Sequence, residues 1–195
     1  EIAAAELAAS DAALILAEII GYGAQTKLFA PKLAEHYDLA ISSFYGLEGD
    51  RLSWEGIPVF PGLGGEYGND YLVQNAASHF GAPRTGLVLT LLDVWVLNTE
   101  VAGQLNMASW VPVDHAPAPP LVRRFFEHSG AIPIAMSRFG QEQLADFDPL
   151  YVPHGIDTDT YHPHDQAEVR EQLGAERDAF IVGMVLTPPD AISQT

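Results

Sequence analysis

The chain has 195 residues, of which 48% are hydrophobic and 18% are charged, so it is able to bury a core and is not a disordered chain. Acidic residues outnumber lysine and arginine 26 to 9, and the formal net charge of −17 argues against a nucleic-acid binder and against docking on anionic lipid. Cysteine is absent, which excludes disulfides, thiolate metal centres and a cysteine nucleophile.

A membrane span is not expected from the apolar segments. The longest run near the start, Ala12–Ile20, is shorter than a bilayer requires and contains Glu18. A secretory signal begins with positive charge, whereas this chain begins with Glu1. We therefore expect a cytoplasmic protein without a transmembrane segment.

The first half of the chain predicts helices and strands in alternation. Residues 1–20 are rich in alanine and favour a helix, which the glycines at 21 and 23 end. The pattern that follows predicts helix Ala24–His36, strand Asp38–Phe44, strand Gly56–Phe60, helix Asn69–Phe80 and strand Gly86–Leu92.

The second half continues the same alternation. Its predicted elements are helix Asn98–Leu105, strand Met107–Val113, helix Pro119–Ser129, strand Ala131–Met136, a helix from Ser137 to Ala145, and strand Leu150–Pro153. Strands with little internal alternation of polarity are typical of parallel sheets that are buried on both faces. The predicted fold class is therefore α/β, with a Rossmann-like parallel sheet flanked by helices.

The character of the chain changes after residue 163. A polar, charged helix is predicted at Asp165–Gly174, and a new apolar strand at Ala179–Val185. We therefore expect a Rossmann-like domain at 1–163, followed at 164–195 by the beginning of a second domain that is largely absent.

One longer motif resembles a known family. The segment Tyr151–Pro163 (YVPHGIDTDTYHP) resembles the interdomain crossover of glycosyltransferases with the GT-B fold, in particular the retaining family of glycogen synthases and mannosyltransferases. The polar helix with Arg170 and Leu173-Gly174 and the strand after it match the segments that follow this crossover. Four other segments resemble loops of the family in the same order: Gly21–Thr26, Leu92–Trp95, Val113–Pro117 and Ala135–Gly140.

The resemblance implies the fold and the reaction. It implies the N-terminal, acceptor-binding half of a GT-B fold, with 164–195 as the crossover helix and first strand of an incomplete donor-binding domain. The implied partners are a nucleotide sugar, which is a substrate and not a cofactor, and a sugar or other hydroxyl acceptor. No metal is required. In the family a strand precedes the glycine loop, so either Ala13–Ile20 forms that strand or the strand is absent.

Candidate catalytic residues follow the predicted strand at 107–113. Asp114 and His115 stand where ligands bind in open α/β sheets, and a carboxylate with an imidazole there suits proton transfer to or from a sugar hydroxyl. The alternative is a helix-capping aspartate and a surface histidine. Gly21 and Gly23 are candidates for binding the donor phosphate through backbone N–H groups, and a plain turn between helices is the alternative.

Acceptor-binding candidates follow two other strands. Asp93 and Trp95 offer a hydroxyl acceptor and an aromatic face, or else a helix cap and a core tryptophan. Ser137 and Arg138 offer a hydroxyl and a guanidinium, or else an N-cap and a solvated arginine.

The crossover motif also supplies candidates for an interdomain hinge. Gly155 and Asp157 are expected to form it, with glycine for a tight turn and aspartate for an Asx turn.

A second function stays open at this point. The chain also suits a non-catalytic Rossmann-like module that binds carbohydrate or protein, with partners in a protein assembly. No spacing typical of a zinc enzyme is present, so we expect no metal site.

Overall fold

The structure is a computed structural model that describes residues 12–17, 22–44, 47, 49–62 and 65–183. The chain divides into two compact units, Glu1–Ile156 and Asp157–Thr195. The boundary at residue 163 that the sequence predicts remains a prediction. The first unit holds the sheet and all the candidate site residues except Asp157.

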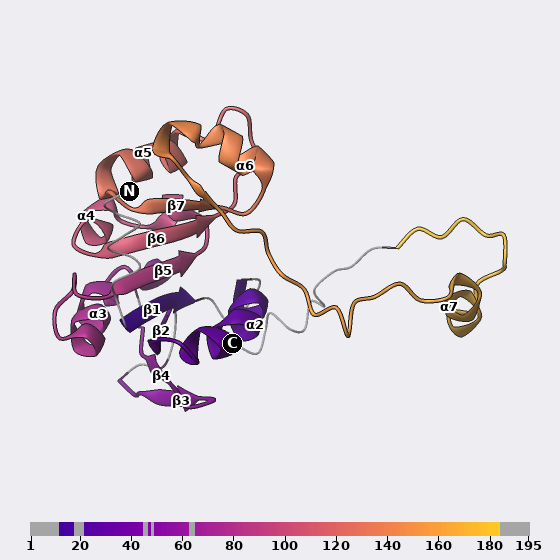
Figure 1. Cartoon of the computed structure of the whole chain (residues 1–195), viewed down its shortest axis with the longest axis horizontal. Helices are drawn as coiled ribbons and strands as arrows, with labels where there is room; N and C mark the ends of the chain where they lie inside the picture. Colours follow the sequence, from indigo (N-terminus) through magenta and orange to yellow (C-terminus); the bar gives the residue numbers. More distant parts are fainter. Residues whose placement is uncertain (1–11, 18–21, 45–46, 48, 63–64, 184–195) are drawn as a thin grey trace. The chain divides into compact units, whose positions relative to one another are not determined.

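The first unit is built on an eight-stranded sheet in the order β3-β4-β2-β1-β5-β6-β7-β8, which Figure 1 shows as a stack of labelled strands from β7 to β3. All neighbouring strands are parallel except β3 and β4. The strands are β1 Ala12–Ala17, β2 Asp38–Ser43, β3 Leu52–Trp54, β4 Ile57–Phe60, β5 Leu87–Leu91, β6 Asn106–Val111, β7 Ile132–Ala135 and β8 Leu150–Tyr151.

The helices connect these strands in the alternation that the sequence predicts. They are α2 Tyr22–Ala34, α3 Leu72–Phe80, α4 Thr99–Ala102, α5 Pro120–Ser129 and α6 Arg138–Gln143, with short 3-10 helices η1 Glu66–Gly68, η2 Val94–Val96 and η3 Ala145–Phe147. The α/β class with a Rossmann-like parallel sheet is confirmed. Asn98 and Ser137 cap α4 and α6, since each side-chain oxygen accepts a backbone N–H.

The core has two sides because successive residues of a strand point to opposite faces of the sheet. Leu14 and Leu16 of β1 belong to the larger cluster, which includes residues of α3, α4 and α5. Ala13 and Ile15 belong to a second cluster with Ala30 of α2. Both faces of β1 are thus packed, which is why this strand is apolar without alternation.

The helix expected at residues 1–20 is wrong for the described part of that stretch. Residues 12–17 form β1, which pairs with β2 on one side and β5 on the other. Alanine and leucine favour a helix locally, but a place between two strands provides backbone hydrogen-bond partners on both edges and buries both faces. The alternative that a strand precedes the glycine loop is therefore confirmed for 12–17. Residues 1–11 and 18–20 lie outside the described residues.

The sequence analysis missed one strand, β3. It forms a hairpin with β4, in which Trp54 pairs with Ile57. The two residues of the turn, Glu55 and Gly56, both have positive φ, which is the conformation of a tight type I′ hairpin. Three residues give too short a pattern to predict a strand.

The second unit contains helix α7, Gln166–Gln172, as predicted, but not the strand predicted at Ala179–Val185. Residues 179–183 have no strand pairing, and Phe180 and Val182 are 92% and 82% exposed. A strand needs a neighbour for its backbone hydrogen bonds, and the described part of this unit offers none. Residues 184 and 185 lie outside the described residues.

Candidate functional site

The order of the strands reverses at β1. The chain proceeds from β1 to β2 on one side, and later from β5 outward on the other side. In open α/β sheets this reversal makes a crevice at the carboxyl edge, where ligands bind. β1 ends at Ala17 and α2 begins at Tyr22, so the start of α2 lies at the same edge.

Three of the predicted groups follow neighbouring strands at that edge. Asp93 comes two residues after β5, Asp114 three residues after β6, and Ser137 two residues after β7. Parallel neighbours lie about 4.8 Å apart, so these loops are adjacent. The structure therefore brings these predicted side chains to one edge of one sheet.

The predicted catalytic pair is in contact. His115 Nδ1 donates to Asp114 Oδ1 at 2.5 Å, and the two side chains are largely exposed, with 72% and 84% of their surfaces open. When Nδ1 carries the proton, Nε2 of the neutral ring is an acceptor. The pair is thus able to accept a hydrogen bond from a hydroxyl group of a ligand.

Arg138 is held in place by two contacts, and Ser137 by one. The Arg138 guanidinium lies 3.8 Å from the ring centre of Tyr151, and its Nη1 donates to Gln141 at 2.8 Å. Ser137 Oγ accepts from Gly140 N at 2.9 Å, which is the capping role given as the alternative. Sequence reasoning missed Tyr151, because nothing in the motif marks it as the platform for the arginine.

The glycine loop is described only in part. Gly23 lies in the first turn of α2, whereas Gly21 lies outside the described residues. Gln25 of the same turn donates from Nε2 to the carbonyl of Gly155 at 3.1 Å, a contact that the sequence did not predict. The start of α2 is therefore tied to the segment that follows β8.

The two hinge candidates, Gly155 and Asp157, differ in whether their residue type is needed for the predicted turn. Gly155 is outside the left-handed region, and a Cβ there would meet nothing within 4 Å, so the tight turn expected there does not require glycine. Asp157 forms the expected Asx turn, since Oδ1 accepts from Asp159 N at 3.0 Å and Oδ2 from Thr160 Oγ1 at 2.7 Å. A hinge movement at these residues remains a prediction.

Trp110 forms a cluster at this edge that sequence reasoning missed. Its Nε1 donates to the carbonyl of Val152 at 2.7 Å, and its ring packs edge-on against His154 and Phe29 at 4.8 and 5.6 Å between ring centres. A tryptophan in a buried strand needs an acceptor for its N–H, and that requirement is the only signal in the sequence. Trp110 thus fixes the segment after β8 against β6.

Burial beside this cluster lowers the pKa of His154 below its ordinary value of 6.5. The folded protein therefore binds this proton less readily than the unfolded chain. The resulting stabilisation is fully present above pH 6.5 and is lost as the pH falls toward the lowered pKa.

We expect the Hε1 proton resonance of His154 in a pH titration to give a pKa below 6.5. Trp110→Leu removes the ring that packs against His154 and should move the pKa back toward the ordinary value. A pKa at or above 6.5 in the unmodified protein would contradict the packing described here.

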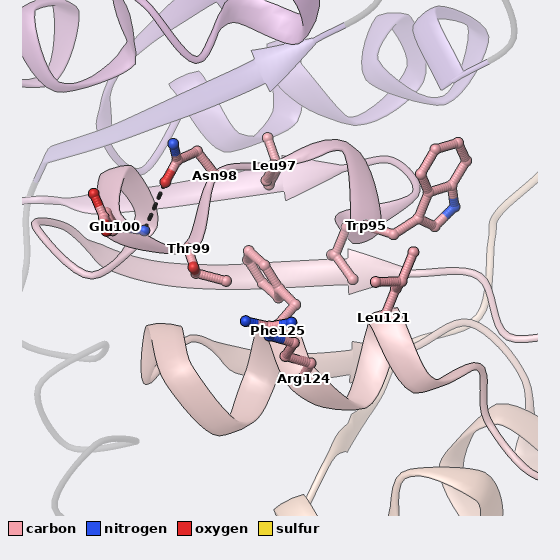
Figure 2. A pocket seen from close by; sticks show the side chains of 9 residues that line it. Trp95, Leu97, Asn98, Thr99, Glu100, Leu121, Arg124 and Phe125 are labelled. Atoms are coloured by element: carbon pink, nitrogen blue, oxygen red, sulfur yellow. Dashed lines mark hydrogen bonds between the residues drawn. The ribbon is translucent and has the colours of Figure 1, made fainter.

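Trp95 stands apart from the other predicted residues and lines a pocket of about 360 Å³ between η2, α4 and α5. Figure 2 shows Trp95 and Leu121 at one end of this pocket and Asn98, Thr99 and Glu100 at the other. Phe125 and Arg124 come from α5. None of the other predicted site residues lines the pocket, so the pairing of Asp93 with Trp95 in one subsite remains a prediction.

The described part of the chain holds neither a metal-binding cluster nor a membrane-spanning helix. Among those residues no three histidine or acidic side chains gather so that they could hold a metal ion. The described helices include none that is long and apolar enough to cross a membrane.

Comparison with known protein families finds no match, and comparison with curated proteins finds none either.

Proposed function

We propose that this chain carries the acceptor-binding domain of a retaining glycosyltransferase of the GT-B fold, which transfers a sugar from a nucleotide sugar to a hydroxyl acceptor. One observation carries the proposal. Asp93, the Asp114–His115 pair and Arg138 follow three neighbouring strands at the carboxyl edge of the sheet, beside the point where the strand order reverses. The motifs that resemble this family supply the same loops.

Asp114 and His115 are the catalytic candidates in this proposal. His115 donates from Nδ1 to Asp114, so the aspartate fixes the ring with Nε2 as the acceptor. Nε2, or the second carboxylate oxygen of Asp114, then accepts the hydrogen bond of the acceptor hydroxyl and orients its oxygen for attack. Asp93 supplies a further carboxylate on the neighbouring strand.

Arg138 has the role of contacting an anionic group. Its guanidinium is exposed but is held by Tyr151 and Gln141, so little side-chain freedom is lost when it binds. Ser137 supports it by capping α6. Residues of a second Rossmann-like domain stabilise the leaving diphosphate in this proposal, because that charge develops on the donor side of the cleft.

The proposal is tested by the melting temperature of the chain with a panel of nucleoside diphosphate sugars and simple glycans. A ligand of the native state at 100 times its Kd stabilises by about 2.7 kcal/mol, so we expect an acceptor glycan to raise the melting temperature. Arg138→Ala and Asp114→Asn should reduce that rise. Arg123→Ala is the matched control, since Arg123 pairs with Asp146 and is not among the candidate site residues.

The possible outcomes separate the functions. Stabilisation by glycans alone, reduced by Asp114→Asn and Arg138→Ala, would support an isolated acceptor half. Stabilisation by glycans that neither variant reduces would favour the non-catalytic carbohydrate-binding module. Stabilisation by neither class of ligand, or an equal effect of the Arg123 and Arg138 variants, would contradict the proposal.

A further inference from the structure

The pocket between η2, α4 and α5 has features that the catalytic proposal does not use. Trp95 is 53% exposed, although tryptophan is usually largely buried. Its backbone is held by Val94, the first residue of η2, and by Leu97, which directly follows η2, because both are buried in the core. An aromatic face is therefore presented to solvent from a rigid backbone.

The polar groups of this pocket are available to a ligand. The Arg124 guanidinium and the Glu100 carboxylate line it, and neither side chain makes a hydrogen bond or ion pair within the described part of the protein. Phe125 supplies part of the apolar wall of the pocket and is almost wholly buried. The pocket thus combines an apolar wall with one acidic and one basic group, and its net charge is zero.

This combination defines the class of ligand. A sugar ring has an apolar C–H face, which packs on an aromatic ring, and hydroxyl groups, which pair with carboxylates and guanidinium groups. A pocket without net charge favours a neutral polar ligand over a phosphate or a cation. The volume of about 360 Å³ is within the range of small-molecule sites, roughly 300–1,000 Å³.

We propose that this pocket binds a distal sugar unit of an oligosaccharide, so that the acceptor is a glycan of two or more units and not a small alcohol. This inference rests on the proposed function, because only a transferase has an acceptor. Trp95 follows Asp93 by two residues. The loop that connects β6 to α5 carries Asp114. A glycan whose terminal hydroxyl lies at the sheet edge therefore extends toward Trp95.

The test uses the indole N–H resonances of the three tryptophans, with gluco-oligosaccharides and manno-oligosaccharides of one to six units as probes. An oligosaccharide should shift the Trp95 resonance and leave that of Trp110 in place, since the Trp110 N–H is bound to Val152. Trp95→Leu should weaken this binding by about tenfold. Tyr37→Leu, which changes another exposed aromatic residue, is the matched control and should not.

The outcomes separate this inference from the proposed function. A nucleotide sugar that binds while no oligosaccharide moves Trp95 overturns the inference alone. Oligosaccharides that bind at Trp95 with an affinity that Asp114→Asn and Arg138→Ala leave unchanged support the carbohydrate pocket and overturn the proposed acceptor site. Oligosaccharide binding that survives Trp95→Leu, or a single sugar that binds as tightly as an oligosaccharide, also overturns the inference.

Discussion

Replacing Trp110 with alanine should lower the free energy of unfolding by about 3–5 kcal/mol. The side chain is 8% exposed and links three parts of the first unit. It packs against Phe29 of α2 and His154, and it binds the carbonyl of Val152. Alanine would leave a cavity and an unpaired carbonyl at once.

Urea unfolding of the alanine variant and of Trp110→Phe separates these two losses. Phenylalanine keeps most of the ring packing but has no N–H to donate, so we expect it to cost about 1–3 kcal/mol. Equal costs for the two variants would show that the hydrogen bond dominates. A cost below about 1 kcal/mol for alanine would contradict the tight packing around this residue.

The second large effect is expected in β1. Leu14 is fully buried in the cluster that joins the sheet to α3, α4 and α5, so Leu14→Ala should cost about 2–5 kcal/mol. Leu28→Ala is the matched control, because Leu28 in α2 is 41% exposed and its replacement should cost about 0.5 kcal/mol or less.

Urea unfolding of both leucine variants measures the difference directly. A clear excess for Leu14 is the result expected of a central strand. Similar costs for the two variants would mean that β1 is not packed on the face that the structure assigns to it.

β1 shows where sequence reasoning reached its limit. AALILA favours a helix by its residue propensities, and only β2 and β5, which are far along the chain, make it a strand. The later strands and helices were predicted because turn residues bound their apolar runs and because α4 and α6 begin after the capping residues Asn98 and Ser137. Local signals therefore sufficed wherever they agreed with the tertiary context.

The candidate site was predictable to a similar extent. Its strand ends follow from the order of elements, so Asp93, Asp114 and Ser137 were each expected after the end of a strand. The contacts between distant segments were not predictable, because no pattern in the sequence joins Gln25 to Gly155 or Trp110 to Val152. The pocket at Trp95 depends on which side of η2 faces solvent, and three residues do not determine that.

The place of β1 in the strand order has a consequence for synthesis on the ribosome. β2 is able to pair with β1 once both have been synthesised, and β4 then adds to β2 on the outside. β5 takes the other side of β1, and β6, β7 and β8 follow outward in turn. No described strand has to enter between two that are already paired. A nascent chain that stops after any strand from β5 to β8 therefore holds a smaller but continuous sheet, whereas a chain that lacks β1 would hold two separate ones.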